Sequence, residues 1–231
     1  AHSLLEQPKY KLQDIYRSLS ILAEESDYIQ AEVYRNSNFL HKRNTKVLYY
    51  DCTNYYFEIE QEDELKKYGK SKEHRPNPIV QMGLFMDNQG IPITYELFPG
   101  NTNDCLTYRP NFGRIKKQFD LGRVISVADK GMTTGDNIWY TINTPTHDGY
   151  VFSMSIRGAE KSLKNYVLKE DEYVTEYKRK SRKSPRTIQV SSVSGKKIKK
   201  QVNEKQVVFW SEKYAKRAKS CADKSRQYCC I

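Results

Sequence analysis

The sequence predicts an α/β fold in which a mixed sheet is flanked by helices. Two short runs of β-forming residues, at 46–51 and 123–129, each end on an aspartate, and their length suits buried strands. Hairpin-like polar connections join the first three strand-like runs, whereas helical patterns separate the later ones. Strands connected in both ways form a sheet with antiparallel and parallel parts, and helices cover such a sheet.

The first half of the chain supplies a helical segment and three strands. Residues 1–45 are expected to be helical, and a second helical piece over 27–35 would be capped by Ser26 or Asp27. The first strand begins at 46 and either ends at 51 or runs on to 58, and the polar, Gly- and Pro-containing stretch 61–78 is expected to be a loop. Runs 79–86 and 91–98 are joined by 87–90, whose final glycine predicts a hairpin. Apolar residues at three- and four-residue spacing predict a buried face on the first helix, at Leu12, Ile15, Tyr16, Leu19 and Leu22.

The second half completes the sheet and then changes character. Asn103 or Asp104 can cap a helix over 106–119, and the strand that ends on Asp129 follows. A short helix around 138–142 and a strand over 149–157 come next. Beyond 158 we expect short strands at 173–177, 187–193 and 207–210, separated by basic turns, and a helix at 211–222. The predicted organisation is therefore a helical segment (1–45), an α/β core (46–160) and a basic β-rich region (161–231).

Charge is distributed unevenly along the 231 residues. Residues 161–231 hold 20 Lys and Arg against 7 Asp and Glu, whereas residues 1–160 hold 19 against 21. A near-neutral body with a strongly basic last third predicts a polyanionic partner, most simply DNA or RNA. The alternative is a solvated basic tail without a partner.

Cysteine usage and hydropathy exclude several classes of protein. The five cysteines form no zinc-binding spacing and no even disulfide framework, so we expect reduced thiols. No apolar run approaches the roughly 18 residues of a membrane span, and no signal peptide is evident, which predicts a cytoplasmic protein.

The two strand-end aspartates, Asp51 and Asp129, are the candidate catalytic and metal-binding residues. If their strands are parallel neighbours, both carboxylates lie at the same edge of the sheet, where ligands bind in open α/β folds. Carboxylate oxygens are the ligands that Mg²⁺ prefers, and two such ions can promote attack on a phosphodiester. For either aspartate alone, a turn or capping role is the simpler interpretation.

Four sequence blocks carry a more specific signal: Asp51-Cys-Thr-Asn-Tyr-Tyr-Phe-Glu58, Gly69-Lys-Ser-Lys-Glu-His-Arg-Pro76, Phe98-Pro-Gly-Asn-Thr-Asn-Asp104 and Val127-Ala-Asp-Lys-Gly-Met132. In this order they resemble the DDE transposases of bacterial insertion sequences. The resemblance covers about residues 46–160 and implies a ribonuclease H-like core, a Mg²⁺ or Mn²⁺ cofactor, and cleavage and strand transfer of DNA. It implies that Asp51 and Asp129 are metal ligands, that the partner is double-stranded DNA (transposon ends and target), and that the protein acts at the bacterial nucleoid. A homodimer is left open.

The third acid of that family is not found. The family carries a glutamate within a Tyr-x2-Arg-x3-Glu-x6-Lys pattern, and no glutamate between 160 and 212 fits it. Region 161–231 resembles the start of the family's β-rich insertion, so we expect a truncated copy. Two alternatives stay open: a catalytically dead DNA-binding remnant, and a two-metal nuclease that uses the same two acids.

Basic residues in three places are candidate DNA contacts. His74 and Arg75 lie in the loop 61–78, and Lys130 follows the second acid, where cations can reach phosphate. The clusters in the last third are expected to make sequence-independent phosphate contacts, at Lys178, Arg179, Lys180, Arg182, Lys183, Lys196, Lys197, Lys199 and Lys200. A solvent-facing loop is the alternative for His74 and Arg75, and a solvated tail is the alternative for the clusters in the last third.

Overall fold

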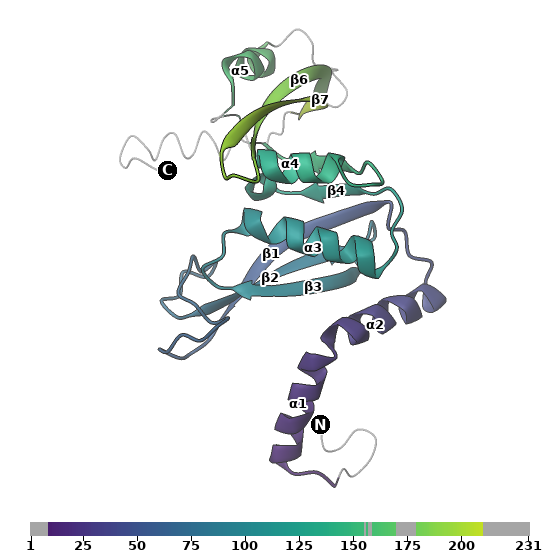
Figure 1. Cartoon of the computed structure of the whole chain (residues 1–231), viewed down its shortest axis with the longest axis vertical. Helices are drawn as coiled ribbons and strands as arrows, with labels where there is room; N and C mark the ends of the chain where they lie inside the picture. The colour runs from purple at the N-terminus through teal and green to yellow at the C-terminus, as the bar shows by residue number, and fades with distance from the viewer. Residues whose placement is uncertain (1–8, 155, 157–158, 170–178, 210–231) are drawn as a thin grey trace. The chain divides into compact units, whose positions relative to one another are not determined.

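The structure is a computed structural model that describes residues 9–154, 156, 159–169 and 179–209. The chain divides into two compact units, Ala1–Ser153 and Met154–Ile231. In Figure 1 most helices and strands of the two units are labelled, numbered in chain order. No helix in these residues is long and apolar enough to cross a membrane.

A five-stranded mixed sheet forms the centre of the first unit. Its strands are β1 (Val47–Tyr56), β2 (Ile79–Met86), β3 (Pro92–Pro99), β4 (Ile125–Ala128) and β5 (Gly149–Phe152). The spatial order is β3-β2-β1-β4-β5. β1, β2 and β3 are antiparallel neighbours, whereas β4 is parallel to β1 and β5 is parallel to β4. This arrangement confirms the mixed α/β sheet that the sequence predicts.

One face of this sheet is buried by helices. Figure 1 shows α3 (Asp104–Gln118) lying across the strands of the first unit, and α4 (Gly135–Ile142) follows β4 in the chain. The core between sheet and helices is aromatic: the rings of Tyr50 and Phe85 lie 4.5 Å apart, and those of Tyr108 and Phe112 stack at 5.3 Å. Asn103 caps α3 by accepting a hydrogen bond from the N–H of Cys105, as the sequence predicts.

The N-terminal helices are present, but the predicted buried face is wrong. α1 spans Leu12–Glu24 and α2 spans Ser26–Leu40, which starts one residue before the predicted piece and continues to residue 40. The apolar residues of α1 at positions 12, 15, 16, 19 and 22 are all exposed. The helical spacing of apolar residues predicts the helix and its apolar stripe, but it does not predict whether another part of the chain covers that stripe.

A buried ion pair joins the segment before β1 to the β2–β3 hairpin. The Nε of Arg43 lies 2.5 Å from a carboxylate oxygen of Asp87, and both side chains are almost fully buried. The same guanidinium donates to the carbonyls of Ile91 and Pro92. The hairpin connection itself is as predicted, because Gly90 adopts a φ of +80°, a conformation that glycine accommodates readily.

The second unit contains one helix and one long β-ribbon. α5 spans Lys161–Leu168, where the sequence pattern predicts no helix, and β6 (Arg179–Ser191) pairs with β7 (Lys197–Phe209) in antiparallel register. The prediction that Lys- and Arg-rich turns separate short strands here is wrong, since those basic runs lie within the two strands. The predicted strand at 173–177 and helix at 211–222 lie outside the described residues.

Candidate functional site

Strand register places the two candidate acids side by side. The parallel pairing of β1 with β4 runs from Val47 and Ile125 to Tyr50 and Ala128. Asp51 is the next residue of β1, and Asp129 directly follows the end of β4 with an extended backbone (φ −75°, ψ 178°). Neighbouring strands lie about 4.8 Å apart, and side chains of paired residues point to the same face.

That shared face is the one that α3 and α4 leave uncovered. Tyr50 and Ala128 are buried, so the residues after them point away from the helical core, and both Asp51 and Asp129 are exposed. Tyr49, Ile125 and Val151 are exposed on the same face. The structure therefore brings two carboxylates to one solvent-accessible position on the sheet.

Asp51 does not end its strand, which corrects one of the two predicted alternatives. β1 continues to Tyr56 and stays paired with β2, where Asp51 faces Leu84. What ends at this point is the pairing with β4. One carboxylate oxygen of Asp51 accepts a hydrogen bond from the N–H of Cys52 at 2.8 Å. The acid thus lies at the point where β1 loses its parallel neighbour.

Asp129 follows β4 directly and caps the short 3₁₀ helix Lys130–Met132. Its Oδ1 accepts a hydrogen bond from the N–H of Gly131 at 2.7 Å. Asp129 therefore has the capping role that was the simpler interpretation. The cap uses one carboxylate oxygen, so the second oxygen is available for another ligand. Neither acid forms an ion pair with another described residue.

The donor chemistry of the pair fits a hard divalent cation. Two carboxylates on adjacent strands offer oxygen ligands, and Mg²⁺ usually binds one or two carboxylates together with waters and substrate phosphates. The exposure of both acids leaves room for those additional ligands. In the part of the chain that the structure describes, no group of three or more His, Cys, Asp or Glu residues forms a ready-made metal cluster.

A buried polar network contacts β1 on the face opposite Asp51. The hydroxyls of Tyr50 and Thr107 lie 2.7 Å apart, and the thiol of Cys52 lies 3.0 Å from the Thr107 hydroxyl. Burial raises the pKa of the Cys52 thiol and of the Tyr50 hydroxyl, so both stay protonated at neutral pH. Because Tyr50 and Cys52 flank Asp51, this network fixes the backbone that carries the acid.

The loop after β1 folds back onto the same strand. The side chain of Asn54 accepts a hydrogen bond from the N–H of Lys72 and donates one to the carbonyl of Lys70. The ammonium of Lys72 donates to the carbonyl of Cys52. The loop is therefore attached to β1 at the residues immediately after Asp51.

Lys72 occupies the edge of β1 that β4 leaves free. The carbonyl of Lys46 accepts from Ile125 of β4 at 2.8 Å, and carbonyls alternate along a strand, so the carbonyl of Cys52 points to the same edge. β4 ends before it reaches that level. The Lys72 ammonium thus lies at the strand edge beside the acids. Sequence reasoning missed this residue, since a lysine in a polar loop carries no signal of its own.

The other predicted residues of this unit occupy separate positions. His74 is exposed in the loop with a φ of +57°, and the guanidinium of Arg75 lies 5.1 Å from the ring centre of Tyr56. Lys130 is exposed in the turn after Asp129. Among these, Lys130 is adjacent to an acid in the chain, whereas His74 and Arg75 belong to the loop that Asn54 holds on β1.

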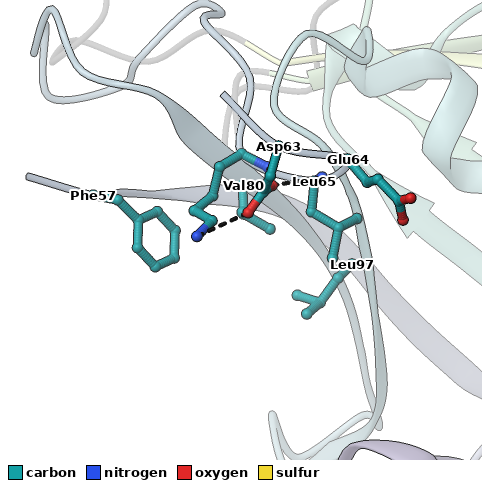
Figure 2. A pocket seen from close by; sticks show the side chains of 7 residues that line it. Phe57, Asp63, Glu64, Leu65, Val80 and Leu97 are labelled. Atoms are coloured by element: carbon teal, nitrogen blue, oxygen red, sulfur yellow. Dashed lines mark hydrogen bonds and ion pairs between the residues drawn. The ribbon is translucent and has the colours of Figure 1, made fainter. Parts of the chain in front are cut away.

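A cavity of about 450 Å³ lies elsewhere on the sheet. Figure 2 shows it between the loop after β1 and the strands β2 and β3, with Phe57, Val80 and Leu97 among its lining residues. Asp63 and Lys66 of the loop form an ion pair at 2.8 Å on its rim, and this contact lowers the pKa of Asp63. Neither candidate acid lines the cavity, so it is distinct from the carboxylate pair.

Comparison with known proteins finds no matching protein family and no matching curated protein. Among solved structures, the chain is similar to piggyBac transposase in a synaptic complex with hairpin DNA, at 9% identity over 69% of this chain and 33% of that chain, with a TM-score of 0.41. It is also similar to Mos1 transposase in a paired-end complex with the left transposon end, at 13% identity over 65% of this chain and 44% of that chain, with a TM-score of 0.32. A third similar structure is the catalytic domain of Mos1 mariner transposase, at 17% identity over 53% of this chain and 50% of that chain, with a TM-score of 0.24. The chain thus spans between a third and a half of these three proteins.

Proposed function

We propose that this chain carries the catalytic core of a DNA transposase of the DDE class, of the kind found in bacterial insertion sequences. The observation that carries the proposal is the register of β1 with β4, which sets Asp51 and Asp129 next to each other on one exposed face. The four sequence blocks that resemble DDE transposases lie around this position, and they include both acids and the loop attached to β1.

In this proposal Asp51 and Asp129 hold divalent cations through the carboxylate oxygens that the backbone does not engage. Bound Mg²⁺ or Mn²⁺ would activate the attacking water or 3′-hydroxyl and stabilise the leaving oxygen of the phosphodiester. The network of Tyr50, Cys52 and Thr107 keeps Asp51 in place, and the cap on residues 130–132 keeps Asp129 in place. Fixed acids of this kind need little rearrangement when the metal and DNA bind.

The proposed substrate is double-stranded DNA, both at the transposon ends and at the target. Four basic residues lie in segments next to the acid pair, and they are proposed to contact phosphates there. Lys130 follows Asp129 in the chain, and Lys72, His74 and Arg75 belong to the loop that is hydrogen-bonded to β1 beside Asp51. The basic ribbon of the second unit provides further cations.

A second candidate function is DNA binding without cleavage, which the concentration of Lys and Arg on β6 and β7 favours. A nuclease that uses the same two acids is the related enzyme alternative. The three functions differ in products: a transposase cuts and joins DNA, a nuclease cuts it, and a binding protein leaves it intact.

The test is incubation of the full chain with a supercoiled plasmid and a labelled duplex in Mg²⁺ or Mn²⁺. We expect nicking and joined products, and a decrease of at least 100-fold in rate for Asp51→Asn and for Asp129→Asn. The matched control is Glu60→Gln, which removes an exposed acid of the same unit and should leave the rate unchanged. Nicking that persists in Asp51→Asn would refute the assignment, and intact DNA under all conditions would favour the binding function.

A further inference from the structure

The two strands of the basic ribbon present two chemically different faces. In the register of β6 with β7, Arg179 lies opposite Phe209 and Ser191 lies opposite Lys197, so odd-numbered residues of both strands share one face. Every odd-numbered residue of these two strands is exposed, whereas most of the even-numbered ones are buried or half-buried. The ribbon therefore has an outward face and an inward face.

The outward face is rich in positively charged side chains. Within the two described strands, it holds five cations and no Asp or Glu: Arg179, Lys183, Lys197, Lys199 and Lys205. Hydroxyl and amide side chains lie between them, at Ser181, Thr187, Gln189, Ser191, Gln201 and Asn203. Such a mixture of cations and neutral donors is typical of surfaces that contact the phosphates and sugars of nucleic acids.

The inward face satisfies its cations within the fold. Lys180 is 4% exposed, donates to the carbonyl of Lys169 and lies 4.5 Å from the ring centre of Tyr166. Arg182 lies over the same ring at 4.3 Å and donates to Gln206. The one acid of the two strands, Glu204, is on this face and pairs with Arg186 at 3.5 Å.

Like charges lie directly opposite each other on the outward face. Lys183 and Lys205 are register partners, and side chains of directly paired residues are separated by about 5 Å at Cβ. Like charges on directly paired residues repel each other and destabilise the pairing. A bound anion between them would remove that repulsion, which makes this position a natural contact for a phosphate.

We propose that the outward face of the β6–β7 ribbon binds the backbone of double-stranded DNA through sequence-independent phosphate contacts. Thirteen residues at a rise of about 3.3 Å give each strand a length of roughly 40 Å, which is comparable to one turn of the double helix. A two-stranded ribbon also has the width that the major groove admits. The proposal rests on the proposed transposase function, because it identifies how the second unit holds that enzyme's DNA.

This assignment changes the set of basic residues that the sequence predicts to contact DNA. Arg179, Lys183, Lys197 and Lys199 stay in the set, and Lys205 joins it. Lys180, Arg182 and Lys200 leave it because they lie on the inward face. Lys196 lies in the connecting turn, outside both faces, and Lys178 lies outside the described residues.

The salt dependence of DNA binding tests the proposal. Fluorescence anisotropy of the full chain with a 30-base-pair duplex gives the slope of log K against log salt, and the magnitude of this slope falls by about 0.9 for each phosphate that the protein no longer neutralises. The variant K183Q/K199Q/K205Q should lower the magnitude of the slope by about 2 to 3. K183R/K199R/K205R should keep it, since every charge is retained.

Neighbouring lysines on opposite faces provide a matched control. Lys199→Gln should reduce the magnitude of the slope by about 0.9, whereas Lys200→Gln should leave it unchanged.

Equal effects of the two single variants, or an unchanged slope for the triple glutamine variant, would overturn the ribbon assignment while leaving the proposed DNA-binding enzyme in place. If the unaltered chain binds no duplex, the proposed function fails with it. A triple glutamine variant that binds DNA normally but no longer binds phosphatidylserine vesicles would assign the face to membranes instead.

Discussion

Asp51 and Asp129 each have one carboxylate oxygen bound to a nearby backbone N–H, and this detail decides how the two acids can act. The hydrogen bonds to Cys52 and Gly131 orient the carboxylates without neutralising them. That both acids lie at the same edge of the sheet could be predicted from the sequence, because each follows an apolar run that forms a strand. The sequence left open whether the first strand ends at Asp51 or runs on to 58, because the residues after Asp51 are polar, and the pairing of β1 with β2 as far as Tyr56 decides for the longer strand.

Gly83 leaves the space that the Tyr50 hydroxyl occupies beside Thr107. A Cβ at this position would lie 2.2 Å from the hydroxyl of Tyr50, so Gly83→Ala must displace the ring and its contact with Thr107. We expect a decrease of about 1–3 kcal/mol in the free energy of unfolding, measured by urea denaturation. The control is Gly122→Ala, where a Cβ meets no atom within 4 Å. Equal stability of the two variants would show that the network tolerates the displacement.

Cys52 should be chemically inert in the folded chain. Burial raises the pKa of its thiol, and the thiolate is the reactive form. We expect iodoacetamide at pH 8 to leave Cys52 unmodified under native conditions and to alkylate it fully in urea, as read by peptide mass spectrometry. Alkylation of the native protein at the rate of a free thiol would show that β1 opens readily beneath the acid.

At the scale of elements, the sequence predicts most of the first unit and little of the second. The strands, the hairpin and the cap of α3 follow from local patterns of β-formers, glycine and asparagine. The full length of β6 and β7 could not be predicted, because their basic residues resemble a turn or a solvated tail. Alternation between an inward and an outward face explains the strands, but it becomes visible only once the register is known.

Asn54 contributes two of the hydrogen bonds that hold the loop over residues 61–78 on β1, beside the contact of the Lys72 ammonium with the Cys52 carbonyl. Asn54→Ala removes its contacts with Lys70 and Lys72, so the loop should detach locally while the sheet stays intact. We expect trypsin to cleave after these two lysines at least several-fold faster, with cleavage after Lys117 in α3 as the internal control. Unchanged cleavage after Lys70 and Lys72 would mean that other contacts fix the loop and the Lys72 ammonium.

At the scale of the whole first unit, a buried ion pair between Arg43 and Asp87 joins the segment before β1 to the β2–β3 hairpin. Burial alone would raise the pKa of Asp87, but hydrogen bonds from Ile91 and Arg43 outweigh it and hold the pKa below its usual value. The folded pKa therefore lies below the unfolded value of about 3.9. The pair stabilises the fold above about pH 4, and this contribution disappears as the pH falls further.

Asp87→Asn should lower the free energy of unfolding by roughly 3–5 kcal/mol at pH 7, because it leaves the Arg43 guanidinium buried without a counterion. The difference between the variant and the unaltered chain should shrink as the pH falls toward 3, as measured by urea denaturation at several pH values. A difference that stays constant with pH would show that the pair does not titrate with folding.

The pairing of β1 with β4 brings Asp51 and Asp129 together, which leads to the proposal that the pair holds a divalent cation. Its most direct test uses Fe²⁺ with ascorbate and peroxide on the full chain, since iron bound in place of Mg²⁺ cuts the nearby backbone. We predict cuts next to both 51 and 129, suppressed by excess Mg²⁺, absent in Asp51→Asn and in Asp129→Asn, and retained in Glu60→Gln. Cuts at one of the two segments alone, or cuts that survive both aspartate substitutions, would contradict it.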